Sequence, residues 1–245
     1  MPVVFCEIDA PRRSVPVGET HVYTTPLDDP VHYLPFLTAE EQDRAGRFRL
    51  GRVRDQFVVA RGRLRALLGH YLGLEPRAVP VQYADGGKPH LPAGYPLHFN
   101  LSHTDGLAVY AVGRARVGVD VERCREIPDA DGLVTRFFSR RECEQFHALP
   151  PSARPAAFLR AWTRKEAVLK AIGRGVQSLD CCEVTFGEGE PPAVLALDGN
   201  RARDHWELFT WEPAAGYLAA GAVEIDGHET RDTRHEKSNG PGRAW

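Results

Sequence analysis

The stretch Leu97–Glu122 reads LHFNLSHTDGLAVYAVGRARVGVDVE and predicts the central strands of the fold. β-Branched and aromatic residues alternate with others on both sides of Asp105-Gly106, a dipeptide typical of hairpin turns. We therefore expect a hairpin over Leu97–Val112 and a further strand over Val117–Glu122.

Helical patterns flank these strands. Thr38-Ala39-Glu40-Glu41 fits a capping box, so a helix should begin there. Apolar residues then recur at helical spacing over Val53–Tyr71, with a break expected near Gly51 and a stop at Gly73.

The C-terminal half repeats this order. Ser139-Arg140-Arg141-Glu142 is a second capping box, Ala156–Ile172 has helical spacing that ends at Gly173, and Trp206–Ile225 is β-rich. A shift of 101 positions places Ser139 on Thr38. We predict an α+β fold of two similar α/β lobes, an N-terminal lobe over 1–123 and a C-terminal lobe over 124–226, followed by a disordered tail over 227–245.

Composition argues against several classes of function. The 245 residues carry a formal net charge of -2, so we expect binding neither to nucleic acid nor to a membrane. No apolar run approaches the roughly 20 residues that span a bilayer, and the first ten residues lack an export signal, so we expect a cytoplasmic protein. The five cysteines lack metal or redox spacing and should be free thiols.

Asp120 and Glu122 should lie on one face of their strand, with Val119 and Val121 on the other. Two carboxylates on one face repel each other unless a cation lies between them, and Mg²⁺ prefers such oxygen ligands. Taken alone, the pair is better explained as a solvated face at a strand end.

Two further motifs are ambiguous when each is taken alone. On the predicted helix, Glu166 and Lys170 are one turn apart, which an ordinary surface ion pair explains equally well. Near the hairpin, Lys88 follows two glycines and offers a cation for phosphate, while Ser102 and His103 offer donors at a strand end. For His103 alone, a structural role is the default.

The order of the motifs along the chain favours a functional interpretation over a structural one. Gly-Gly-Lys-Pro at 86–89, Phe-Asn-Leu-Ser-His at 99–103, Gly-Val-Asp-Val-Glu at 118–122 and Trp-Thr-Arg-Lys-Glu-Ala-Val-Leu-Lys at 162–170 follow one another. This series resembles the 4'-phosphopantetheinyl transferases of the large, single-chain, surfactin-synthetase-activating type, over about residues 38–186. The resemblance implies two lobes related by a pseudo-twofold, with coenzyme A and Mg²⁺ (Mn²⁺ as the alternative) in the cleft between them.

The resemblance also implies roles for single residues. Asp120, Glu122 and Glu166 would be the metal ligands. The contacts to coenzyme A would come from Arg44, Gly87, Lys88, Pro89, Ser102, His103 and Lys170. Arg44, with Arg47 as a helper, would lie near the 3'-phosphate. Glu41 departs from the basic residue that some family members carry there, and this leaves phosphate binding at that edge open.

The implied reaction is transfer of the 4'-phosphopantetheine arm of coenzyme A to a serine of an apo acyl or peptidyl carrier protein, with release of 3',5'-ADP. Glu166, Lys170 and His103 would be the catalytic residues, with Glu166 as the base, directly or through a metal-bound water. A monomer is implied, and the sequence does not rank peptide-synthetase, polyketide and fatty-acid carriers. Arg136, Phe137 and Phe138 are candidates for carrier docking, although a core position for the two phenylalanines is favoured.

Two other functions compete with this one. One is a non-catalytic protein of the same fold that binds coenzyme A or carriers, but such a protein does not need the complete set of carboxylates and Lys170. The other is a phosphodiesterase that removes the arm from carriers, but the sequence shows no second His and Asp cluster to activate water.

Overall fold

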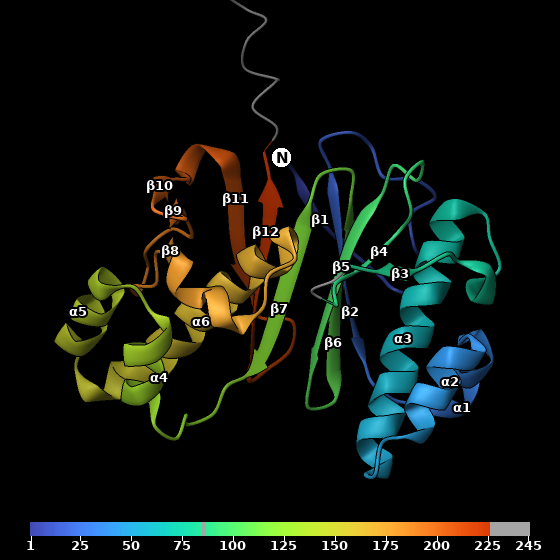
Figure 1. The fold of residues 1–245 in the computed structure, drawn as a ribbon, viewed down its shortest axis with the longest axis horizontal. Helices are drawn as coiled ribbons and strands as arrows, with labels where there is room; N and C mark the ends of the chain where they lie inside the picture. Colours follow the sequence, from blue (N-terminus) through green and yellow to red (C-terminus); the bar gives the residue numbers. More distant parts are fainter. Residues whose placement is uncertain (85–86, 226–245) are drawn as a thin grey trace, which may run out of the picture.

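The computed structural model describes residues 1–84 and 87–225, which form a mixed α/β fold (Figure 1). The α-helices are α1 Pro30–Tyr33, α2 Ala39–Gly46, α3 Gly51–Leu72, α4 Ala130–Phe137, α5 Arg140–Ala148 and α6 Arg154–Ile172. The strands are β1 Val3–Cys6, β2 Thr20–Pro26, β3 Gln82–Tyr83, β4 Pro89–His90, β5 His98–Thr104, β6 Leu107–Gly113, β7 Val117–Arg123, β8 Cys182–Val184, β9 Val194–Leu197, β10 Asn200–Arg201, β11 Trp206–Trp211 and β12 Tyr217–Glu224. Short 3₁₀ turns cover Leu34–Phe36, Pro76–Ala78, Pro151–Ala153, Val176–Cys181 and Arg203–His205.

The N-terminal half is a four-stranded sheet in the order β1-β2-β6-β5, covered by α3. β5 and β6 are antiparallel, and Asp105-Gly106 forms the turn between them, so the predicted hairpin is confirmed. The core between α3 and the sheet contains Leu64, Leu68 and Tyr110. The helix ends at Gly73 as predicted, because Gly73 adopts the left-handed conformation (φ 67°) that glycine tolerates best.

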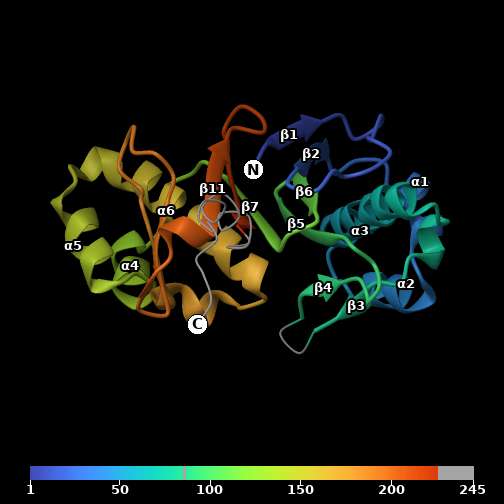
Figure 2. The same cartoon turned by 90° about the horizontal axis from the view of Figure 1, so that it is seen from above.

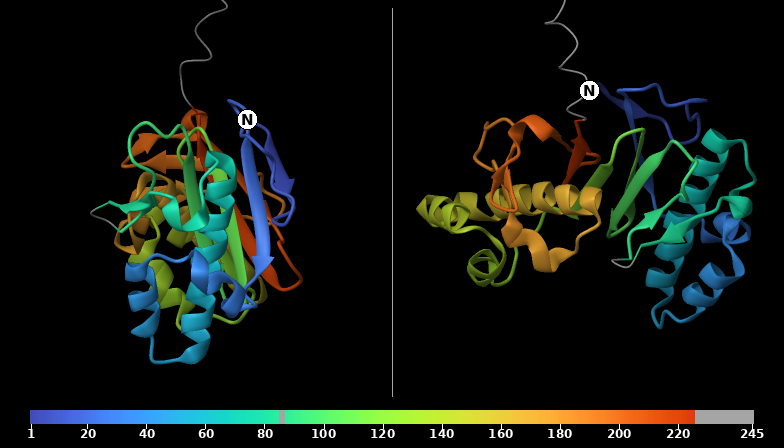
Figure 3. Two further views of the ribbon diagram at one scale, coloured as in Figure 1. Left: turned by 90° about the vertical axis from the view of Figure 1, so that its right-hand side faces the viewer. Right: turned by 45° about the horizontal axis from the view of Figure 1, so that its top comes forward.

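The C-terminal half holds two three-stranded sheets, β11-β12-β7 and β10-β9-β8. The long helix α6 crosses them, as the right-hand view of Figure 3 shows. Ala167, Leu169 and Ala171 of this helix pack into one core with residues of β8, β9, β11 and β12. The helical interpretation of Ala156–Ile172 and the β-rich interpretation of Trp206–Ile225 are therefore confirmed.

The two halves meet where β5 lies beside β7, in the middle of the view in Figure 2. Although β7 follows β6 in the chain, it pairs antiparallel with β12, with Asp120 opposite Ala220. The lobe boundary at residue 123 stays a prediction. β7, which lies just before it, pairs by hydrogen bonding with β12 of the C-terminal half. The predicted tail over 227–245 lies outside the described residues.

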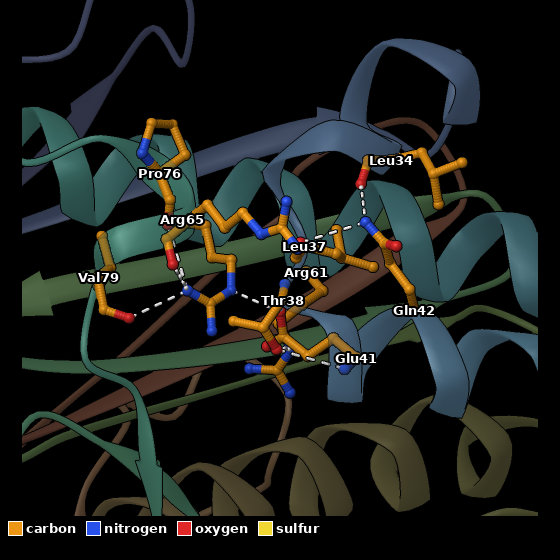
Figure 4. A network of polar contacts seen from close by, with 10 residues as sticks. Leu34, Leu37, Thr38, Glu41, Gln42, Arg61, Arg65, Pro76 and Val79 are labelled. Carbon is orange, nitrogen blue, oxygen red and sulfur yellow. Dashed lines mark hydrogen bonds and ion pairs between the residues drawn. The ribbon is translucent and has the colours of Figure 1, made fainter.

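Both predicted capping boxes are present, and each is tied to the long helix of its own half. Thr38 caps α2, and the Glu41 carboxylate accepts from the Thr38 amide (3.1 Å) and from Arg65 Nε of α3 (2.5 Å; Figure 4). In the C-terminal half Ser139 caps α5, and Glu142 pairs with Lys165 of α6. Both ion pairs are buried, so removing one partner would leave a charge without compensation.

Three features of the fold were not predicted. The parallel pair β1 and β2 at the start of the chain was missed, as was the small β8-β9-β10 sheet. The pairing of β7 with β12 was not expected either. Among the described residues, no helix has the length and apolar character needed to cross a membrane.

Candidate active site in the cleft between the halves

β7 presents the two predicted carboxylates to α6. Val117, Val119 and Val121 pack into a core cluster on the other face of the strand. A Cβ atom added to Gly118 would lie 2.0 Å from Ala167 O and 2.4 Å from Ala171 N of α6. Gly118 therefore lets the helix backbone approach the strand, and alternation places Asp120 and Glu122 on the same side. The predicted division of the two faces is confirmed.

Glu166 and Lys170 of α6 lie over this face. Lys170 Nζ donates to Asp120 Oδ1 at 2.6 Å and lies 4.0 Å from Glu166 Oε2. Asp120 and Glu166 are buried, 4% and 7% exposed, so their charges are poorly screened. The structure thus brings together the carboxylates of Asp120 and Glu166 and the ammonium group of Lys170.

Crowding and burial change the acidity of the carboxylates. The pKa of Glu166 is raised to about 7, mainly by burial and further by the charges of Asp120 and Glu122, against the opposing effect of Lys170. The pKa of Glu122 is raised by burial and by Asp120. Carboxyl groups that share a poorly hydrated site resist ionising together unless a cation joins them.

The donor set fits a hard divalent cation in its chemistry. In the part of the chain that the structure describes, the buried atoms Asp120 Oδ2 and Glu166 Oε1 have no hydrogen-bond partner, and such oxygens are the ligands that Mg²⁺ prefers. Within the described ranges, no three His, Cys, Asp or Glu side chains are already arranged to hold a metal ion. The ammonium group of Lys170 takes the other oxygen of Asp120. The metal assignment accordingly stays a proposal.

Ser102 and His103 belong to β5, which lies beside β7 at the boundary between the two halves. We call this boundary the seam. Ser102 Oγ donates to Asp120 Oδ1 at 2.9 Å and accepts from Lys170 Nζ at 3.0 Å, so it joins the two halves at the site. His103 is exposed on β5, and its pKa is lowered by partial desolvation of the ring and then by the charges of Lys170 and Arg61. His103 is therefore neutral near pH 7.

Lys88 reaches from the N-terminal half to the C-terminal half. Its ammonium group donates to Ala171 O of α6 at 2.7 Å and to Val117 O at 3.5 Å, and burial lowers its pKa to about 8. A pocket of about 200 Å³ opens beside it, lined by Gly87, Lys88, Pro89, Asn100, Leu101, Lys170, Gly173 and Arg174. Four of these were predicted as contacts to coenzyme A, and sequence reasoning missed Asn100, Leu101, Gly173 and Arg174.

Larger pockets lie elsewhere. Pockets of about 660 and 380 Å³ flank Trp206 on the C-terminal half, and none of the predicted site residues lines either one. We place the site at the smaller pocket, because that pocket adjoins Lys170 and the carboxylates.

Arg44 and Arg47 lie on α2 and at its C-terminal end, and neither lines the pocket beside Lys88. Both are exposed on α2 or at its end, and Arg44 stacks over the ring of Phe57 at 5.3 Å. Glu41 departs from the family pattern. Its carboxylate accepts from the backbone N–H of Thr38 and from Arg65, so it stabilises the fold. It places one negative charge close to Arg61, 3.5 Å away.

Arg61 is the most prominent residue that the sequence reasoning missed. It is 8% exposed on α3, and among the described residues its Nε and Nη1 atoms make no hydrogen bond, although Nε lies 3.5 Å from Glu41 Oε1. Its guanidinium lies 6.0 Å from the Phe57 ring that also carries Arg44, and its charge acts on His103. The ion pair with Glu41 compensates part of this charge and leaves Nη1 as a donor that a second anion can accept from. The signal in the sequence was an arginine inside the apolar stripe of a helix.

The two phenylalanines suggested for carrier docking pack against the core, which was the favoured interpretation. Phe138 is buried and stacks on Phe158 at 5.7 Å, so it is a core residue. Phe137 is half-buried and contacts Trp162 edge to face, while the exposed Arg136 covers its ring at 5.0 Å. Phe138 has no surface to offer a carrier protein.

Comparison with known proteins identifies the family. A family model described as the 4'-phosphopantetheinyl transferase superfamily matches residues 116–222, the part that contains all three carboxylates and Lys170. The 4'-phosphopantetheinyl transferase HetI of Nostoc sp. (strain PCC 7120) is 37% identical over 87% of this chain and 91% of its own length. The 4'-phosphopantetheinyl transferase of Bacillus subtilis is 28% identical over 67% of this chain and 73% of its own length. The 4'-phosphopantetheinyl transferase AcpT of Salmonella typhi is 40% identical over 55% of this chain and 69% of its own length. The match to HetI extends through both halves of the fold, and the chain belongs to the 4'-phosphopantetheinyl transferase superfamily.

Proposed function

We propose that the cleft binds coenzyme A together with Mg²⁺ and transfers its 4'-phosphopantetheine arm to a serine of an apo carrier protein. Membership of the superfamily makes the chain a transferase of this arm. In the reaction the serine Oγ forms a bond to the β-phosphorus of coenzyme A. The bond from that phosphorus to the bridging oxygen breaks, and 3',5'-ADP leaves with the bridging oxygen. The observation that carries the proposal is the meeting of Asp120, Glu166 and Lys170 beside a pocket lined by Lys88.

Asp120, Glu122 and Glu166 would hold the metal ion, which when bound neutralises charge on the pyrophosphate. The residues of the chain supply the remaining positive charge. Lys170 can turn its ammonium group from Asp120 toward a phosphate, since it lines the pocket as well as the carboxylate site. His103, neutral near pH 7, can donate one ring N–H without repelling the neighbouring cations.

Glu166 is the proposed base for the proton of the carrier serine. In the metal-free protein its pKa is raised to about 7, so this carboxylate accepts a proton more readily than that of an exposed glutamate. The carboxylate also lies next to Lys170, which stabilises the ionised form that must accept the proton. We assign the proton to Glu166 Oε1 or Oε2 at the moment when the serine oxygen attacks.

We further propose the large, single-chain type of enzyme, with two lobes related by a pseudo-twofold. The support is internal to the chain. Each half carries a capping box whose glutamate pairs with a basic residue of the long helix, Glu41 with Arg65 and Glu142 with Lys165. The family match at 116–222 covers one half, and the second half would complete the cleft.

Incubation of the protein with Mg²⁺, coenzyme A and an apo carrier protein tests the function. The expected result is a gain of one phosphopantetheine group on the carrier serine, measured by intact mass spectrometry, and its loss when EDTA replaces Mg²⁺. An unchanged carrier mass would favour the non-catalytic binding protein. Loss of the arm from a holo carrier would favour the phosphodiesterase. A panel of apo carriers from peptide-synthetase, polyketide and fatty-acid systems would then rank the substrates.

Arg61 is proposed to bind the 3'-phosphate of coenzyme A with Arg44. Arg61→Ala should raise KM for coenzyme A by roughly 10- to 100-fold, because a hydrogen bond to a charged group contributes roughly 1.5–3 kcal/mol. KM for 3'-dephospho-coenzyme A should change little, since that substrate lacks the group. Arg63→Ala is the matched control, because Arg63 contacts Asp9 and Tyr33 instead. Equal losses with both substrates would contradict the assignment.

A further inference from the structure

The seam between β5 and β7 is bridged by side chains. β5 pairs with β6 and β7 pairs with β12, so at the seam each strand is the edge of its own sheet. Neither backbone ladder continues across the seam, and all residues of both strands are described. A buried backbone N–H at such an edge needs an acceptor from elsewhere.

Asn100 supplies that acceptor. Its Oδ1 atom accepts from the backbone N–H of Val119 at 2.9 Å, in surroundings where Asn100 is 4% exposed and Val119 is fully buried. Two positions along β5, Ser102 Oγ donates to Asp120 Oδ1. The two side chains thus contact consecutive residues of β7, and the first contact holds the backbone directly before Asp120.

We propose that Asn100 is a positioning residue for the reaction, which fixes β7 against β5 so that the Asp120 carboxylate meets Ser102 and Lys170. The pairing with β12 holds β7 from one side only, and Asn100 holds it from the other at the peptide that precedes the carboxylate. Residues that orient a ligand of a metal ion typically change metal affinity or activity by about 10- to 100-fold when replaced. The inference rests on the proposed metal site of the enzyme.

The test compares Asn100→Leu with Asn100→Asp. Leu has nearly the same size but accepts no hydrogen bond, whereas Asp keeps an oxygen where Oδ1 lies. Two quantities are measured well below the unfolding temperature: kcat per folded molecule, and the dissociation constant for Mn²⁺ from its electron paramagnetic resonance signal without coenzyme A.

For Asn100→Leu we expect Mn²⁺ binding weakened about tenfold and kcat lowered about 10- to 100-fold. Asn100→Asp should bind Mn²⁺ at least as tightly as the original protein. Asn200→Leu, at an exposed asparagine of β10, should change neither quantity. If Asn100→Leu does not fold, Asn100→Ala removes the same acceptor without adding bulk.

The outcomes separate the inference from the function on which it rests. If Asn100→Leu keeps the Mn²⁺ affinity and kcat of the original protein, the positioning role is overturned. It is also overturned if Asn100→Asp loses Mn²⁺ affinity and kcat as much as Asn100→Leu does. Asp120→Asn reports on the metal site itself. If Asp120→Asn binds Mn²⁺ as the original protein does, the metal assignment fails, and the role of Asn100 fails with it.

Discussion

Glu166→Gln is expected to lower the rate of transfer by at least about a thousandfold and yet to stabilise the protein without metal. The loss of activity follows from removing both a proposed ligand and the proposed base, each of which typically contributes two or more powers of ten. The stabilisation follows from burial, because the neutral amide avoids the cost of an ionised carboxylate near Asp120 and Glu122. Rate and stability should therefore change in opposite directions.

The size of the stability effect depends on pH. The pKa of Glu166 is about 7 in the folded protein and 4.5 as its ordinary value, so between these values the folded state binds more protons than the unfolded state. The stability associated with protonated Glu166 is complete below pH 4.5 and is lost as pH rises to about 7. At pH 8 the Gln variant should unfold with a free energy roughly 2–3 kcal/mol higher than the original protein.

Urea unfolding in EDTA at pH 4.5 and pH 8 measures this difference, and the carrier mass assay measures transfer. Glu144→Gln, at an exposed glutamate of α5, is the matched control and should leave both unchanged. A Gln variant with more than a tenth of the original turnover would refute the role of Glu166. A stability difference that does not vary between the two pH values would refute the buried, crowded environment.

Gly118→Ala should destabilise the fold and disrupt the site together. Its new Cβ would meet backbone atoms of Ala167 and Ala171, which cannot rotate away as a side chain does. Either α6 or β7 must move, and we expect a loss of about 3 kcal/mol in the free energy of unfolding. The same displacement moves Glu166 and Lys170 away from Asp120, so transfer should fall by about a hundredfold in molecules that remain folded.

Gly46→Ala is the control for this variant, because no atom of residues 1–84 or 87–225 lies within 4 Å of a Cβ at that helical position. It should leave transfer unchanged and add about 0.5–1 kcal/mol of stability. Chemical unfolding and the transfer assay at 15 °C separate the two effects of Gly118→Ala. A variant with original stability would show that the helix and the strand are not in close contact at this glycine.

Local features of the fold were predictable because a few neighbouring residues determine them. The capping boxes at Thr38 and Ser139 need only four residues each, and Asp105-Gly106 specifies its own turn. The strand face that carries Asp120 followed from alternation alone. In each case the decisive contacts lie within one element or one turn.

Contacts between distant segments were not predictable in this way. The sequence of β7 does not indicate that its partner is β12, and nothing near Lys88 indicates that its ammonium group binds the end of α6. The resemblance to a family brought the site residues together, but it left Arg61 and Asn100 unnoticed. Their roles depend on which groups lie across α3 and across the seam.

The pairing of β7 with β12 leads us to expect a particular order of folding during synthesis. During synthesis the strand with Asp120 leaves the ribosome well before Ala220, its partner one hundred positions later. The N-terminal sheet and its helix lie wholly upstream of β7 and can fold first. Until β12 has emerged, β7 lacks the strand that pairs with it, and we expect transfer activity only once that strand is in place.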